Sequence, residues 1–339
     1  MRPLIVLALA ATLAACGAPM AQPQRPAQTQ PAAGAKTAIT VAMPYIPNVQ
    51  FAQYYVAASK GYYAAEGLDV SFDYNFETDV VQRVANGTVQ FGMASGDSVL
   101  LARSQGLKVK MVATINQQFP TVFFSKKAAG IVAPADLKGK SVGIPGRFGA
   151  SYTGLRAILY ASKLTEQDLN IQEIGFAQVP ALTEDKVQVA SGYGNNEPVQ
   201  LQLQGVDVNV IRVADIYPLA SDGIIASEKL MAEQPETVRK FVRATLRGMT
   251  DAIASPDEAF TISQAQIKEL ASAPDATKKL QRAVLQATLP YWQSDLTAKS
   301  GLGFTDPAKW QATVTFLTDS GSLKTAVRPE DGYSNDYLK

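Results

Sequence analysis

Residues 37–72 read TAITVAMPYIPNVQFAQYYVAASKGYYAAEGLDVSF. The first seven alternate in polarity and stop at a proline, a pattern typical of a β-strand. Aromatic and alanine residues then recur at helical spacing from Gln50 to Tyr63, with Gly61 interrupting the pattern near its end. A second strand is predicted at 68–72. A strand, a helix and a strand in this order predict an α/β fold.

The same alternation continues along the chain. Further strands are predicted at 89–94, 109–115, 121–125, 141–144, 171–176 and 208–211, with one more ending at Gly192-Tyr193. Helices are predicted at 78–85, 97–105, 150–163, 179–185, 198–204, 235–254, 259–270, 277–289 and 310–318. Strands that alternate with helices predict mostly parallel sheets covered on both faces.

The pattern restarts near residue 134, which predicts two α/β lobes with the second inserted in the first. We expect residues 38–126 plus 218–339 to form the first lobe, with a helical C-terminal part, and residues 127–217 to form the second. Two linked lobes leave a cleft at their junction, where small-molecule sites concentrate.

The chain begins MRPLIVLALAATLAAC, with Arg2 followed by a short apolar run and small residues before Cys16. This pattern predicts a signal peptide over residues 1–15, because the apolar run is too short to span a bilayer. Leu-Ala-Ala-Cys resembles a bacterial lipobox, which implies a lipid on Cys16; a plain signal peptide with a chance cysteine is the alternative. Residues 16–37, rich in Ala, Pro and Gln, predict a flexible tether. We therefore expect an exported cell-envelope lipoprotein, periplasmic or on the outer face of the cytoplasmic membrane, that meets the membrane only through this lipid.

Composition narrows the possible chemistry. The 31 basic and 30 acidic side chains give a net charge of +1 without long runs, which gives no reason to expect nucleic acid as a partner. The chain has no histidine, which excludes Ser-His-Asp and Cys-His catalysis and the usual zinc sites. Cys16 is the only cysteine, so no second thiol remains for catalysis or a disulfide. We predict a binding protein with no catalytic residues, metal or cofactor; hydrolysis by carboxylates such as Asp97 and Glu197 is the enzymatic alternative.

Ligands of open α/β sheets bind beyond the carboxyl ends of the strands. The turns there predict these contacts: Tyr45, Asn48 and Phe51 after the first strand; Phe76 and Glu77 after the second; Ser95 and Asp97 after the third; and Arg147, Phe148, Ser151 and Tyr152 at the second lobe's first long helix. Helix capping explains Asn48, Glu77, Ser95 and Asp97 as well as ligand contact does, and core packing is an equal alternative for Tyr45 and Phe51. Phe119 is a further candidate with the same alternative.

Residues 193–198 read YGNNEP and follow a strand that we expect to be buried. Amides offer hydrogen-bond donors and acceptors together, which matches the mixed edge of a pyrimidine or pteridine-like ring. We therefore predict that Tyr193, Asn196 and Glu197 contact a ligand. A solvated turn is the alternative.

Four segments resemble the substrate-binding proteins of ABC importers, in the subgroup that serves thiamine-pyrimidine precursors, riboflavin and alkanesulfonates. They are PYIPNVQFAQYYVAASKGYYAAEGLDV at 44–70, FGMASGDSVLLARSQG at 91–106, ADLKGKSVGIPGRFGASYTGLRA at 135–157 and YGNNEP. The resemblance covers about residues 38–320. It implies a two-lobed periplasmic-binding-protein-like fold of type II, an ABC permease and ATPase as partners, and a monomer.

Within that subgroup, GRFGASY and NNEP look closest to the vitamin binders, which implies riboflavin or the hydroxymethyl- or formylamino-pyrimidine used for thiamine. We expect rings of Tyr45, Phe76, Phe148 and Tyr152 to sandwich such a ligand while Asn48, Asp97, Asn196 and Glu197 pair with its edge. The alternatives are an alkanesulfonate or other small anion held by Arg147, and a lipoprotein scaffold without a ligand. Some relatives are pyrimidine synthases that consume an active-site histidine, which this chain lacks.

Overall fold

The computed structural model describes residues 36–74 and 77–339. The predicted signal peptide, Cys16 and Phe76 lie outside the described residues, and so does the side chain of Glu77. No helix in the described part of the chain is long and apolar enough to cross a membrane.

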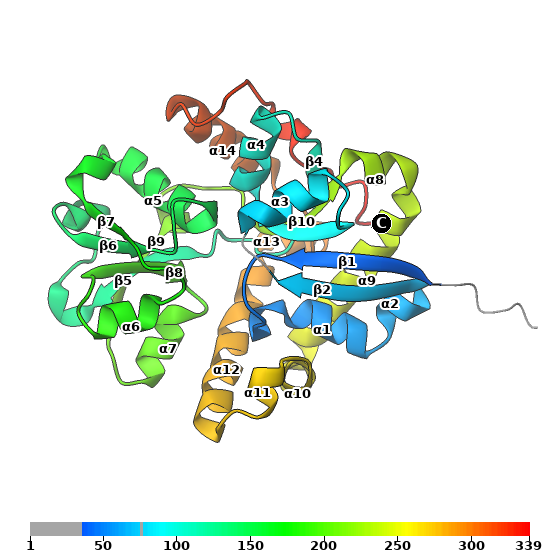
Figure 1. The fold of residues 1–339 in the computed structure, drawn as a ribbon, viewed down its shortest axis with the longest axis horizontal. Helices are drawn as coiled ribbons and strands as arrows, with labels where there is room; N and C mark the ends of the chain where they lie inside the picture. The colour runs from blue at the N-terminus through cyan, green and yellow to red at the C-terminus, as the bar shows by residue number, and fades with distance from the viewer. Residues whose placement is uncertain (1–35, 75–76) are drawn as a thin grey trace, which may run out of the picture. The chain divides into compact units, whose positions relative to one another are not determined.

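Two sheets, each with five strands, organise residues 36–339 as far as they are described (Figure 1). The first sheet has the order β2-β1-β3-β10-β4, with bounds β2 Leu68–Tyr74, β1 Thr37–Met43, β3 Phe91–Ser95, β10 Asp222–Ser227 and β4 Val109–Thr114. The second has the order β7-β6-β8-β5-β9, with bounds β7 Asn170–Glu173, β6 Ser141–Ile144, β8 Val189–Tyr193, β5 Thr121–Lys126 and β9 Val208–Arg212. The predicted two-lobed α/β architecture is confirmed.

Helices cover both sheets. The helices that alternate with strands of the first sheet are α1 Ala52–Ser59, α2 Tyr62–Ala65, α3 Glu77–Ala85 and α4 Gly96–Ser104. Those that alternate with strands of the second sheet are α5 Gly149–Ser162, α6 Gln178–Thr183 and α7 Glu197–Leu203. The C-terminal part holds α8 Glu228–Glu233, α9 Pro235–Ala254, α10 Pro256–Gln266, α11 Lys268–Ala271, α12 Asp275–Thr288, α13 Asp295–Ser300 and α14 Pro307–Asp319. Single 3₁₀ turns are η1 Val49–Phe51, η2 Lys127–Ala129, η3 Pro134–Leu137, η4 Glu166–Asp168, η5 Val213–Asp215, η6 Leu289–Trp292 and η7 Pro329–Asp331.

In each sheet four of the five strands run in one direction, which confirms the prediction of mostly parallel sheets, and one strand runs against them. In the first sheet β1 runs parallel to β2 and β3, whereas β10 runs antiparallel to β3 and β4. In the second, β6 is parallel to β7 and β8, and β5 is antiparallel to β8 and β9. The two antiparallel strands are those on which the chain arrives from the other lobe. Such a strand is not delivered by the crossover helix that makes neighbouring strands parallel.

The assignment of β5 to the first lobe, within residues 38–126, needs correction. Val122 pairs with Gly192 and Phe123 with Ile211, so β5 is an inner strand of the second sheet. Its sequence, TVFFSK, is buried along nearly its whole length and would suit an inner strand of either sheet. Local pattern therefore could not show at which strand the chain changes lobes.

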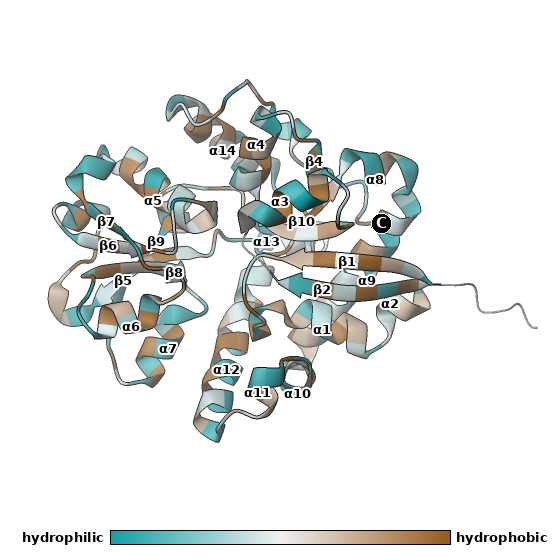
Figure 2. Ribbon diagram, in the orientation of Figure 1, coloured by the Kyte–Doolittle hydropathy of each residue, from teal (hydrophilic) through white to brown (hydrophobic). Residues whose placement is uncertain are grey.

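The helix predicted from Gln50 to Tyr63 is broken into η1, α1 and α2. Gly61 has φ +71°, a conformation that glycine adopts without strain, and it separates α1 from α2. Helix α1 packs on α9, where Gly248 lets the two backbones approach: a Cβ at this position would collide with the Gln53 carbonyl. Figure 2 shows hydrophobic colour along β1 and part of β5, in keeping with their buried faces.

Candidate functional site

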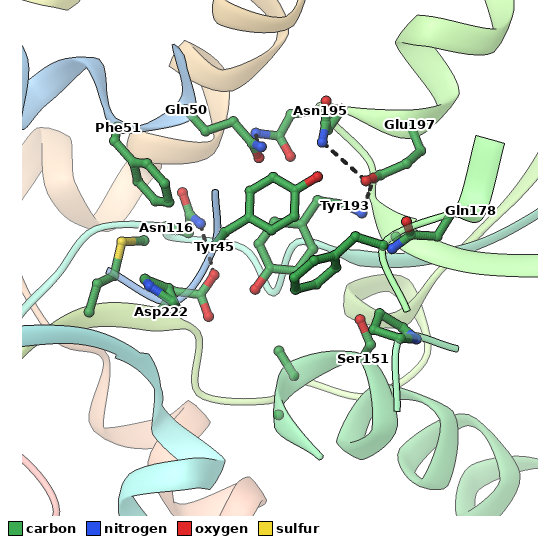
Figure 3. Close-up of a pocket in the computed structure, with 18 of the residues that line it drawn as sticks. Tyr45, Gln50, Phe51, Asn116, Ser151, Gln178, Tyr193, Asn195, Glu197 and Asp222 are labelled. Carbon is green, nitrogen blue, oxygen red and sulfur yellow. Dashed lines mark hydrogen bonds between the residues drawn. The ribbon is translucent and has the colours of Figure 1, made fainter. Parts of the chain in front are cut away.

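A cavity of about 870 Å³, including the part open to solvent, lies between the carboxyl ends of strands from both sheets (Figure 3). Pro44 follows β1, Met93 lies near the end of β3, Pro145 follows β6 and Tyr193 ends β8. The start of α5 and the end of α12 complete its wall. This is where ligands of open α/β sheets bind.

Seven of the predicted contact residues line this cavity: Tyr45, Phe51, Phe148, Ser151, Tyr193, Asn196 and Glu197. They come from three of the predicted segments, namely the turn after β1, the start of α5 and the turn between β8 and α7. The structure therefore brings together turns that lie between about 40 and about 150 residues apart in the sequence.

Four other predicted residues lie outside the lining. Asn48 caps η1, its side chain accepting a hydrogen bond from Gln50 N at 3.0 Å. Ser95 and Asp97 are fully buried at the junction of β3 and α4. Phe119 is 3% exposed and packs in the hydrophobic core. Capping and core packing, the alternatives given for Asn48 and Phe119, describe these two side chains.

Arg147 and Tyr152 also lie outside the lining, because a carboxylate of their own lobe holds them. The Arg147 guanidinium is paired with Glu166 and lies 3.5 Å from Glu173 Oε1. The Tyr152 hydroxyl donates to Glu166 Oε1 at 2.6 Å, and the Arg147 guanidinium lies over the Tyr152 ring. These side chains form a surface cluster at the start of α5. Neither Arg147, predicted to hold an anion, nor Tyr152, predicted to stack on a ring, lines the cavity.

Tyr45 forms an aromatic wall that spans the lobes. Its ring centroid is 4.7 Å from that of Phe176, edge to face at 86°, although Tyr45 follows β1 and Phe176 follows β7. The Tyr45 hydroxyl lies near the side chain of Asn196, which also lines the cavity. Burial and the nearby Glu197 carboxyl raise the pKa of Tyr45, so its hydroxyl stays protonated. Phe176 was predicted to end a strand, but β7 stops at Glu173 and frees the ring for the cleft.

Glu197 is the most distinctive polar group of the site. It is 5% exposed, and its two oxygens accept hydrogen bonds from Tyr193 N at 2.8 Å and from Asn196 Nδ2 at 3.1 Å. Gly192 makes room for this carboxyl, since a Cβ there would collide with Glu197 Oε2. Burial raises the pKa of Glu197 from 4.5 to about 7, against the opposing effect of the donors.

This pKa predicts how stability depends on pH. Between pH 4.5 and about 7 the folded chain keeps a proton on Glu197 that the unfolded chain has released, so stability falls as pH rises through this interval. Tyr45, the titratable group facing Glu197, stays neutral throughout. Thermal melts across this range should show a falling melting temperature for the wild type and a smaller fall for Glu197→Gln. Equal slopes for the two proteins would contradict the assignment.

Sequence reasoning missed further lining residues: Gln50, Asn116, Phe176, Gln178, Asn195, Asp222 and Thr288. Asn116 and Asp222 lie where the chain crosses between lobes, and Asn116 Nδ2 donates to Asp222 Oδ2 at 3.0 Å. No local pattern marks a crossing strand as part of a site. Gln50 and Asn195, by contrast, lie within the turn after β1 and the YGNNEP segment, which were both predicted to contact a ligand. The sequence did not show which way these two side chains point.

The charges of the lining side chains limit which kinds of ligand the cavity can hold. Among the described residues that line the cavity there is no Lys or Arg, whereas Glu197 and Asp222 both contribute carboxyl groups. No cluster of His, Cys, Asp and Glu in the described part of the chain could hold a metal ion. Flat rings beside amides and carboxyls suit an uncharged ligand rich in hydrogen-bond donors better than an anion.

Comparisons with known proteins identify the family and the fold. A family model described as NMT1/THI5 like matches residues 48–259. The riboflavin-binding protein RibY of Chloroflexus aurantiacus is 52% identical over 335 residues, which are 96% of this chain and 94% of that protein. The formylaminopyrimidine-binding protein of Halalkalibacterium halodurans is 26% identical over 302 residues, covering 88% and 89%.

Among solved structures, the periplasmic aliphatic sulphonate binding protein SsuA from Escherichia coli superposes with a TM-score of 0.68. The match covers 89% of this chain and 99% of that one, at 13% identity. At this identity the match shows the fold alone.

Proposed function

The chain belongs to the NMT1/THI5-like family, and on that premise we propose that it is the exported solute-binding protein of an ABC importer and that its ligand is riboflavin. The observation that carries the proposal is the cleft itself, where aromatic rings from both lobes lie beside amides and a buried carboxyl. The 52% identity to a riboflavin-binding protein over nearly the whole chain supports this ligand.

Riboflavin matches the two kinds of surface in the cavity. Its tricyclic ring is flat and carries carbonyl groups and an N–H at one edge, and its side chain carries hydroxyls. Tyr45, Tyr193 and Phe148 supply rings for the flat faces. Amides such as Gln178 and Asn196 can donate to carbonyls, and the carboxyls of Glu197 and Asp222 can accept from N–H or O–H groups. The rings then contribute mainly affinity, and the polar edge mainly specificity.

A thiamine-pyrimidine precursor is the second candidate. It also needs a flat wall and a mixed hydrogen-bonding edge, and a relative with 26% identity is named for a formylaminopyrimidine. In this second case, we propose that the chain binds such a pyrimidine without converting it, because it has no histidine of the kind that the pyrimidine synthases consume.

Titration of ligand-free protein with riboflavin, followed by flavin fluorescence, tests the proposal. We expect quenching with a micromolar or lower Kd, which corresponds to a binding free energy of about 8 kcal/mol or more. Unchanged emission together with heat released on adding the pyrimidine would favour the second candidate. A protein that shows no thermal shift with vitamins or sulfonates would contradict both.

The substitution Arg147→Ala distinguishes a site for a vitamin from a site for an anion. Arg147 is paired with Glu166 outside the cavity, so we expect riboflavin affinity within about twofold of wild type, and little loss of stability because exposed ion pairs contribute about 0–1 kcal/mol. The same titration gives the answer. Sulfonate binding by the wild type that is lost in Arg147→Ala would support the alternative in which this guanidinium holds an anion.

Export and anchoring form the remaining part of the proposal. The predicted signal peptide and a lipid on Cys16 would hold the protein at the cell envelope, where it delivers its ligand to the permease. Mass spectrometry of the mature N-terminus tests this: we expect acyl groups on Cys16, and an unmodified N-terminus would contradict the anchor.

A further inference from the structure

Asn195 ties the second lobe to the first. It lies between β8 and α7, is 2% exposed, and its Nδ2 donates to Gln50 Oε1 at 3.0 Å and to Thr288 Oγ1 at 2.9 Å. Both acceptors belong to elements packed with the first sheet, η1 and α12. The Thr288 hydroxyl donates its own proton to Val284 O at 2.8 Å, so its oxygen can only accept from Asn195. This fixes which end of the amide is the nitrogen.

The oxygen of the same amide is left without a partner. Asn195 Oδ1 is buried and accepts no hydrogen bond from any described residue. Asn195 lines the cavity, and in Figure 3 its side chain lies beside Gln50 with the oxygen turned toward the interior. A buried acceptor without a donor costs about 1–3 kcal/mol, so the position favours a ligand that supplies one.

We propose that Asn195 accepts a hydrogen bond from an N–H or O–H group of the ligand while its nitrogen holds the two lobes together. One amide group thereby selects the ligand through its oxygen and holds the cleft closed through its nitrogen. The inference rests on the proposed function and deepens it: among flat heteroaromatic compounds, the site selects those that present a donor at Asn195.

Riboflavin has donors of two kinds, the ring imide N–H and the side-chain hydroxyls. Two analogues separate them: riboflavin methylated at the imide nitrogen lacks the first, and lumiflavin, with a methyl group in place of the hydroxylated chain, lacks the second. We expect the wild type to prefer riboflavin over one analogue by about tenfold or more, as for one buried hydrogen bond. The analogue that is disfavoured identifies the donor.

Two substitutions at Asn195 and one elsewhere test the assignment. Asn195→Val has a similar volume but no acceptor, so the preference between riboflavin and that analogue should disappear. Asn195→Asp keeps an acceptor and loses the nitrogen, so binding should weaken while the preference remains. Tyr291→Phe removes another contact between the lobes, the hydrogen bond from Arg212 Nη1 at 3.1 Å, without altering the cavity lining. This variant should bind all three flavins more weakly, by the same factor.

Fluorescence titration of the four proteins, each checked by a thermal melt, gives the result. Asn195→Val that keeps the wild-type preference, or a wild type with no preference against either analogue, would overturn the inference. A wild type that binds none of the three flavins would instead overturn the proposed function.

Discussion

Tyr45→Ala should weaken riboflavin binding by about 100-fold, or about 3 kcal/mol. The substitution removes a half-buried ring from the cavity, together with its edge-to-face contact with Phe176. Aromatic pairing alone contributes about 0.5–1.5 kcal/mol beyond the area that is buried, and the lost apolar area adds about 25 cal/mol per Å². Fluorescence titration measures the effect.

Tyr45→Phe is the matched control, because it keeps the ring and its contact with Phe176 and loses only the hydroxyl. We expect a loss of about tenfold or less. Tyr160→Ala, at an exposed ring outside the cavity lining, should bind like the wild type. Affinity of Tyr45→Ala within about threefold of wild type would show that this ring is not a wall of the ligand site.

Much of the fold could be predicted from periodicity, because burial of one face imposes it. Helix α9 was predicted with its observed bounds, Pro235–Ala254, since its apolar residues recur at helical spacing next to a proline suited to a first turn. The one reversed strand in each sheet and the lobe to which β5 belongs could not be predicted in this way. They depend on partners distant in sequence, as β5 shows by pairing with β8 and β9.

The site shows the same division. The rule that ligands bind beyond strand ends selected the turns containing Tyr45, Phe148 and Glu197, and all three line the cavity. Arg147 was misplaced because its carboxylate partner Glu166 follows in the same lobe and holds it outside the cavity. Asp222 was missed because the chain reaches the site there on a strand returning from the other lobe.

Glu197→Gln should weaken riboflavin binding by roughly 30- to 100-fold. Both oxygens of the native carboxyl already accept from donors, Tyr193 N and Asn196 Nδ2. A glutamine amide has one oxygen, so its NH₂ must face one of these donors, and a buried donor left unpaired costs about 1–3 kcal/mol. The ligand also loses an acceptor at this edge. Glu184→Gln, at an exposed position in the same lobe, should leave the affinity unchanged.

The pH dependence of binding separates loss of an acceptor from simple disruption of the turn. The carboxyl accepts a ligand donor best when ionised, so binding releases a proton and wild-type affinity should rise with pH through about 7. The glutamine variant cannot ionise there, so its affinity should not rise. A variant that binds more weakly but keeps the wild-type pH profile would assign the titration to another group and remove Glu197 from the ligand edge.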